Sequence, residues 1–260
     1  MNGLHASGTL PAVLLAETRS EILKALRVPA FLVPTLVFPA MFYVLFALML
    51  NGGAVIGSTG IPAYMLATYG TFGVVGAALF GMGIGVAAER GQGWLTLKRA
   101  TPMPPIAYFL AKAVMSMIVG ALIMALLTVL AVSFGGVRMS AAAWIMLFVV
   151  LTAGAIPFCA FGCALGYASG PSSAPMLANL IYLPMSLLSG LWLPIENMPG
   201  FLRAVAPFMP PYHLAQLALA PVRDSWQGAP LHVAALTGFT VLFLAAAVLA
   251  YRRDDGRTWG

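Results

Sequence analysis

The chain has 260 residues, of which 61% are hydrophobic and only 8% charged, and its formal net charge is +6. An ordinary soluble domain carries roughly 25% charged residues, so this composition excludes a water-soluble fold. A nucleic-acid-binding protein would cluster its Lys and Arg residues on one solvated face. Here they lie in short segments between long apolar runs, which is typical of a membrane protein.

The first recognisable element along the chain is an amphipathic segment. Residues 14–27 place leucines on one helical face and charged side chains on the other, which predicts a helix lying in the membrane interface. Beyond it, six apolar runs reach the length of about 20 residues that crosses a bilayer as a helix. The predicted spans are 29–50, 61–88, 106–134, 141–168, 174–193 and 230–251.

The basic residues give this topology a direction. Ten of the thirteen Lys and Arg residues fall on the side where the N-terminus lies. Loops rich in Lys and Arg stay in the cytoplasm, so both termini are expected to be cytoplasmic, in a cell membrane of the bacterial inner-membrane type. The expected units are an N-terminal segment (1–28), a transmembrane domain (29–251) and a tail (252–260).

Two sets of small residues occur inside the spans. Cys159 and Cys163 are one helical turn apart, and we interpret them as packing residues rather than as a disulfide or metal site. The second span carries a stripe of small residues that would let another helix approach closely, either within the subunit or between subunits. The stripe consists of Gly73, Ala77, Gly81 and Gly85.

Several chemistries lack their motifs. No ionisable residue lies well inside a predicted span, with Lys112 assigned to a loop, which argues against a proton-coupled carrier and a charge-lined channel. The histidines His5, His213 and His232 are scattered along the chain, and no H-E-x-x-H motif or metal site is expected. There is also no phosphate-binding loop of the G-x-x-x-x-G-K-[ST] type. If ATP drives this chain, a separate subunit must hydrolyse it.

The stretch AAERGQGWLTLKRATPMPP, residues 87–105, interrupts two apolar runs on the predicted cytoplasmic side. Its glycines and prolines bracket residues 94–99, which are expected to form a short interfacial helix with an apolar face and two basic residues. The pattern of this stretch alone leaves two interpretations open. It is either a docking element or a loop whose charges only set the topology.

The same stretch resembles the cytoplasmic loop of type-2 ABC transporter permeases, through the pattern E-R-x-x-G-x-L-x-x-L/K-R-x-T-P. These proteins are membrane subunits of drug, polysaccharide and lipid exporters. Residues 189–218 resemble the segment that follows the fifth span in that family. Gly91 departs from the family pattern, because many members have an acidic residue there.

The resemblance implies an all-α integral membrane fold with six transmembrane helices, an N-terminal interfacial helix, a cytoplasmic coupling helix and an outer re-entrant helical segment. It also implies a non-enzymatic chain without a cofactor of its own. ATP and magnesium would bind to a cytosolic ABC-type ATPase partner. A second permease copy, in a homodimer or heterodimer, and membrane lipid would be the other partners, with no nucleic acid.

The resemblance assigns three groups of residues. The ATPase-coupling group is Glu89, Arg90, Trp94, Leu95, Leu97, Lys98, Arg99, Thr101 and Pro102. The outer-gate group is Glu196, Arg203, Tyr212 and His213. A substrate path between the second and fifth spans would involve Met176, Tyr182, Met185, Leu188 and Ser189.

The expected function is ATP-driven export of a hydrophobic or amphipathic substrate, drug-like or lipid-like. Two other functions remain open from the sequence. One is a non-transporting membrane anchor or immunity component of an ATPase complex. The other is a channel or carrier that works without an ATPase.

Overall fold

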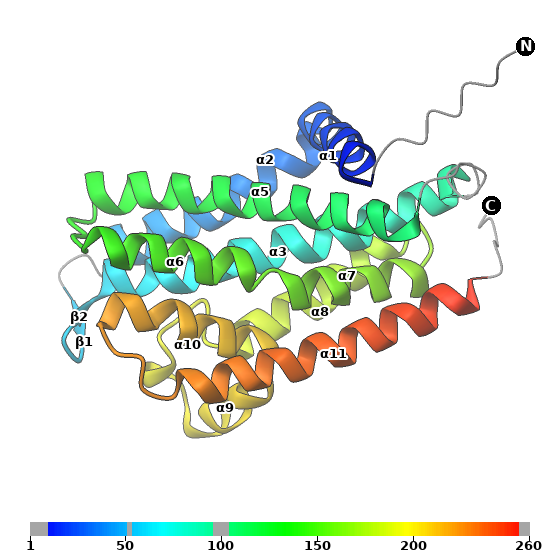
Figure 1. Ribbon diagram of the computed structural model, residues 1–260. Coiled ribbons are helices and arrows are strands. Elements are labelled where there is room, and N and C mark those ends of the chain that lie inside the picture. Colours follow the sequence, from blue (N-terminus) through cyan, green and yellow to red (C-terminus); the bar gives the residue numbers. More distant parts are fainter. Residues whose placement is uncertain (1–9, 51–53, 96–103, 255–260) are drawn as a thin grey trace, which may run out of the picture.

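The computed structural model describes residues 10–50, 54–95 and 104–254, and the elements named here lie within those ranges. Long helices run side by side in a bundle, with a small hairpin at one end (Figure 1). The all-α membrane fold is confirmed at the level of helix content and apolar spans. The helix nearest the N-terminus, α1, packs on α5 at an angle to the long helices (Figure 1).

The helices are α1 (Leu10–Arg27), α2 (Pro29–Phe42) with its π-helical continuation (Tyr43–Met49), α3 (Ile61–Gly91), α5 (Pro105–Ser133), α6 (Ala141–Ala153), α7 (Ile156–Ala168), α8 (Ala174–Leu188), α9 (Gly200–Val205), α10 (Pro210–Arg223) and α11 (Ala229–Arg253). Single 3₁₀ turns occupy Ile195–Asn197 and Ala206–Phe208. The hairpin strands β1 (Val55–Ile56) and β2 (Thr59–Gly60) pair antiparallel.

Five segments of the described chain are long and apolar enough to cross a membrane. They are Leu32–Met49, Ile61–Gly91, Ile106–Ser133, Ala141–Ala168 and Ala229–Arg253. The predicted span 174–193 differs, because α8 ends at Leu188 after 15 residues. Such a helix is about 22 Å long at 1.5 Å per residue, less than the hydrocarbon thickness of about 30 Å. The count of six spans and the re-entrant segment therefore stay predictions.

The span 141–168 is two helices rather than one. Helix α6 ends at Ala153 and α7 begins at Ile156, with Pro157 in the first turn of α7. A proline ring clashes with the carbonyl four residues earlier, here that of Ala153, and offers no N–H to it. The helix therefore breaks just ahead of the proline, and the two halves pack on different neighbours: α7 on α3 and α11, and α6 on α10.

Helix α3 runs through the middle of the bundle (Figure 1) and contacts α2, α5, α7, α8 and α10. Glycines make the closest of these approaches possible. A Cβ atom added to Gly162 of α7 would lie 2.8 Å from the carbonyl oxygen of Leu79, and one added to Gly73 would lie 2.5 Å from the side chain of Ile123 on α5. At Gly73 the small-residue stripe thus packs within the subunit. Cys159 and Cys163 are buried free thiols, as a packing role requires.

Candidate functional site

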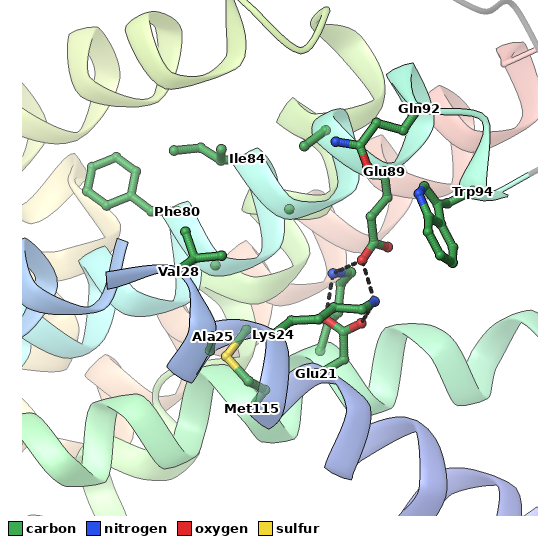
Figure 2. Close-up of a pocket in the computed structure, with 14 residues that line it drawn as sticks. Glu21, Lys24, Ala25, Val28, Phe80, Ile84, Glu89, Gln92, Trp94 and Met115 are labelled. Carbon is green, nitrogen blue, oxygen red and sulfur yellow. Dashed lines mark hydrogen bonds and ion pairs between the residues drawn. The ribbon is translucent and has the colours of Figure 1, made fainter. Parts of the chain in front are cut away.

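Four charged side chains meet where α1, α3 and α5 come together (Figure 2). We call Glu21, Lys24, Glu89 and Lys112 the ion cluster. The Nζ atom of Lys112 lies 2.6 Å from Glu21 Oε2 and 3.2 Å from Glu89 Oε1. The Nζ atom of Lys24 lies 2.7 Å from Glu21 Oε1 and 2.8 Å from Glu89 Oε1. Two cations and two carboxylates thus neutralise one another.

The sequence builds this cluster from short helical spacings. Glu21 and Lys24 are three residues apart on α1, so they share a face. On α5, Tyr108 lies one turn before Lys112, and its hydroxyl donates a hydrogen bond to Glu89 Oε2 at 2.6 Å. The side chains of Glu21 and Lys112 are only 2% and 3% exposed. Burial of charges at this depth is tolerated only where each has an opposite partner.

Lys24 is the outermost member of the ion cluster, with a side chain that is 43% exposed. Burial alone would lower the pKa of its ammonium group, but hydrogen bonds and charge attraction from Glu21 and Glu89 outweigh burial and raise the pKa above its ordinary value. Lys24 therefore stays protonated at neutral pH.

Arg90, the next residue after Glu89, points to another side of α3 because successive helical residues are about 100° apart. Its guanidinium donates to the carbonyl oxygens of Gly166 at 3.2 Å, of Tyr167, and of Ser169 at 2.8 Å. These carbonyls end α7, where helix carbonyls have no partner within the helix and attract cations. Asp254, just beyond α11, lies 4.0 Å from Arg90 Nε. Arg90 thus joins α3 to the end of α7 and to the residue that follows α11.

The coupling residues predicted from the sequence divide into three groups. Glu89 and Arg90 are largely buried and bind other helices of the same chain. Trp94 is 50% exposed, whereas Leu95 is buried. Outside the described residues lie Leu97, Lys98, Arg99, Thr101 and Pro102. The ATPase contact of all these residues stays a prediction.

The sequence assigned only Glu89 of the ion cluster to a functional group and gave no site role to Glu21, Lys24 or Lys112. It placed Lys112 with the loop charges, whereas the structure places it two turns into α5 and buries it. It placed Glu21 on the polar face of the amphipathic helix without a partner. The one available signal was Lys112 itself, a charge inside an apolar run, because such a residue needs a buried counter-charge.

A cavity of about 420 Å³ adjoins the ion cluster (Figure 2). Charged groups and the amide of Gln92 line one part of it, Trp94 lies at its edge beside Glu89, and apolar or small side chains line the remainder. The lining is Glu21, Lys24, Ala25, Val28, Phe80, Gly81, Ile84, Gly85, Ala88, Glu89, Gln92, Trp94, Lys112 and Met115. Its walls suit a molecule with a polar end and an apolar body.

A second cavity, of about 310 Å³, lies between α2, α3 and α8 and shares Phe80 and Ile84 with the first. Of the predicted path residues, Tyr182 lines it, and its hydroxyl donates to the carbonyl of Phe72 at 2.6 Å. Met185 and Ser189 are buried on α8 and just after it, Leu188 is half-buried, and Met176 is exposed. The five predicted residues therefore do not share one surface.

The predicted gate residues lie at the end of the bundle that carries the β1–β2 hairpin, which we call the hairpin end. Glu196 forms an ion pair of 2.7 Å with Arg223, a residue the sequence did not single out, and accepts from the Tyr64 hydroxyl at 3.1 Å. Arg203 is exposed on α9.

Tyr212 and His213 lie against His232. The expectation that the histidines are scattered is wrong for this pair, because the turn between α10 and α11 brings their rings together.

The fold and sites thus define a multi-pass helical membrane protein in which buried charged residues join several helices at one end of the bundle. Residues 13–221 match the family model described as ABC-2 type transporter. The chain is also 26% identical over 251 residues to a Bacillus subtilis (strain 168) protein named "Putative transport permease YvfS", covering 94% of this chain and 98% of that protein. The chain belongs to the ABC-2 type transporter family. It is a membrane transport component of an ABC exporter, a class of transporter that includes an ATPase partner.

Proposed function

We propose that this chain is the permease half of an exporter that moves a hydrophobic or amphipathic, drug-like or lipid-like substrate outward. A separate cytosolic ATPase would supply the energy through residues 89–102. One observation carries the proposal: Glu89 and Arg90, at the start of that segment, bind α1, α5, α7 and the end of α11. A displacement of the segment would therefore reach four helices at once.

Within this proposal the residues of the segment have different roles. Glu89 and Arg90 transmit force inside the permease, since their charges are satisfied by other helices. Trp94 offers the ATPase an exposed aromatic side chain, and such residues often dominate protein interfaces. Leu95, which is buried, anchors the segment from within. Lys98 and Arg99 would orient the partner.

The two cavities along α3 would form the inner part of the substrate path. They share residues, and both are mostly apolar, which suits an amphipathic substrate entering from the membrane. Both termini would be cytoplasmic, and two permease copies would assemble with two ATPase subunits. Glu196, Arg203, Tyr212 and His213 would line the outer exit.

The decisive experiment replaces Trp94 with alanine and compares it with Trp226→Ala, since Trp226 is 44% exposed at the hairpin end. We expect the affinity of the ATPase for the permease to fall roughly tenfold or more in Trp94→Ala, the size of an interface hot spot. Trp226→Ala should bind as the wild type does. Equal affinities in the two variants would contradict the coupling assignment.

Vesicles that contain the permease and its ATPase distinguish export from the two other functions. Outward movement of a lipophilic fluorescent cation that requires ATP hydrolysis supports the proposal. A complex that binds ATPase but moves no lipophilic cargo points to an anchor or immunity component. Flux without ATP points to an uncoupled channel or carrier.

A further inference from the structure

His213 and His232 form a close pair at the hairpin end that has no part in the coupling mechanism. Their Nδ1 atoms are 3.0 Å apart, and His213 Nε2 lies 2.8 Å from the carbonyl oxygen of Pro207. His213 is buried on α10, whereas His232 is partly exposed in the first turn of α11. The two contacts together determine where the protons lie.

A carbonyl oxygen can only accept, so the proton of neutral His213 must be on Nε2. The Nδ1 atom of His213 is then an acceptor, and the proton between the rings must belong to His232 Nδ1. Neutral His232 consequently carries no proton on Nε2. The contacts thus assign opposite tautomers to the two rings and leave one basic nitrogen without a proton.

His232 lines a cavity of about 320 Å³ at the end of α10 and the start of α11. A Cβ atom added to Gly228, which also lines this cavity, would lie 3.8 Å from the Nε2 atom of His232. Most of the polar lining can donate hydrogen bonds. The lining is Gln216, Leu219, Ala220, Arg223, Ser225, Gln227, Gly228, Ala229 and His232.

His232 can take up a proton on Nε2 without losing its contact with His213, because its Nδ1 keeps donating to His213 Nδ1. Among the described residues, the titratable groups that contact it or share its cavity are Tyr212, His213 and Arg223 of α10. Asp224 is exposed just after α10. Arg223 uses Nη2 for its ion pair with Glu196, and its guanidinium has further N–H groups. Protonation therefore places a second cation beside the same cavity.

We propose that this cavity is an anion-binding site that is switched on by protonation of His232. Its ligand is an oxyanion, such as a sulfate, phosphate or carboxylate group, free in solution or carried by a lipid headgroup. Arg223 and protonated His232 provide the charge, and the amides of Gln216 and Gln227 and the hydroxyl of Ser225 provide hydrogen bonds. The site is independent of the coupling proposed for the other end.

The proton assignment can be tested directly, since the chain has only three histidines. The full chain is labelled with ¹⁵N in its imidazole rings and studied by NMR in maltoside micelles, with His5→Gln used for assignment. At a pH of about 8 both rings should be neutral. We expect the proton of His232 on Nδ1 and that of His213 on Nε2. A neutral His232 with its proton on Nε2 would overturn the proposal.

Binding is tested by titrating sulfate, whose charge stays constant between pH values of about 5.5 and 8, while chloride holds the ionic strength constant. The sulfate concentration that gives half of the change in the His232 ¹⁵N chemical shift should be at least tenfold lower at the acidic pH than at the higher pH. His232→Asn keeps a donor near the Nδ1 position and lacks the Nε2 atom. In that variant the ¹⁵N chemical shift of His213 should report weak sulfate binding that is the same at both pH values. If the asparagine still donates its hydrogen bond to His213 Nδ1, the site is folded.

A parallel sample without sulfate contains anionic phosphatidylglycerol in the micelles. A shift of His232 at acidic pH in this sample identifies a lipid headgroup as the ligand, whereas a shift with sulfate alone identifies a soluble anion. Either result supports the site. Shifts of equal size at both pH values, a full response in His232→Asn, or no shift with either anion at acidic pH would each refute it.

Discussion

Helices α3 and α11 are both long and apolar, yet one forms the core of the bundle and the other its rim. In an 18-residue apolar window of each helix, the mean hydropathy is 1.8 for α3 and 2.4 for α11, while 78% and 11% of those windows are buried. The less apolar helix is thus the more buried one. Lipid is as apolar as a leucine-rich interior, so hydropathy does not separate the two environments, and close packing of small residues does.

The glycines of the two helices show this contrast most clearly. Along α3, Cβ atoms added to Gly70, Gly73 and Gly76 would each lie within 3.0 Å of a neighbouring side chain. In α11, a Cβ atom added to Gly238 would meet nothing within 4 Å. Glycine is therefore a packing requirement in α3, whereas position 238 tolerates a larger residue.

The largest effect is expected from Lys112→Met, which removes the cation that neutralises Glu21 and the α3 residue Glu89. Breaking one partner of a buried ion pair costs about 3–5 kcal/mol, because the opposite charge is left without compensation. Stability is measured in detergent as the temperature at which the buried thiols of Cys159 and Cys163 react with a maleimide dye. Lys24→Met should cost less, since Lys24 is partly exposed. Equal losses in the two variants would contradict this account of the ion cluster.

The next effect compares one substitution at two places. Gly162→Ala forces α7 away from the α3 backbone and should destabilise the protein by about 1–3 kcal/mol, the usual cost of overpacking. Gly238→Ala on α11 should leave stability unchanged or raise it by up to about 1 kcal/mol, because alanine favours the helix. The same thiol assay measures both. A loss at position 238 that matches the loss at 162 would remove the contrast between core and rim.

The smallest effect concerns single hydrogen bonds. Tyr182→Phe removes the bond to the α3 carbonyl of Phe72 and should cost about 0.5–1.5 kcal/mol. Thr237→Val removes a bond within exposed α11, to the carbonyl of Val233, and should cost nothing measurable because the helix bond to that carbonyl remains. Thermal unfolding of the two variants side by side tests this. A larger loss in Thr237→Val would show that α11 is packed against a partner.

The sequence predicted the spans well wherever an apolar run ends in a polar or charged segment. The predicted span 61–88 corresponds to α3, which extends three residues further. The prediction 174–193 ran too far, because it followed apolar composition past Ser189. Gly190 has a φ of 72°, a left-handed conformation that ends helices, and the chain turns there. Composition reports the environment of a segment and does not report its backbone path.

The sites were less predictable than the spans. Glu89 bonds to Lys24, 65 residues away, and Lys112 bonds to Glu21 across 91 residues. A charged residue in a sequence indicates that a partner or water is needed, but not which residue provides it. The histidine pair has the same origin, since periodicity places His213 and His232 on separate helices and only the packing of α10 on α11 joins their rings.

The adjacency of Glu89 and Arg90 has a consequence for the evolution of this family. Glu89 is bound by the side chains of Lys24 and Lys112, so replacing Glu89 alone leaves the two lysines with only the carboxylate of Glu21. Replacing the whole ion cluster with apolar residues can instead leave the stability nearly unchanged. Relatives should therefore keep or lose Glu21, Glu89 and Lys112 together. Arg90 donates its hydrogen bonds to backbone carbonyls, which every residue provides. Two neighbouring positions in an alignment of the family should thus vary under different rules: position 89 in step with Glu21 and Lys112, and position 90 independently of them, with Asp254 as its acidic contact.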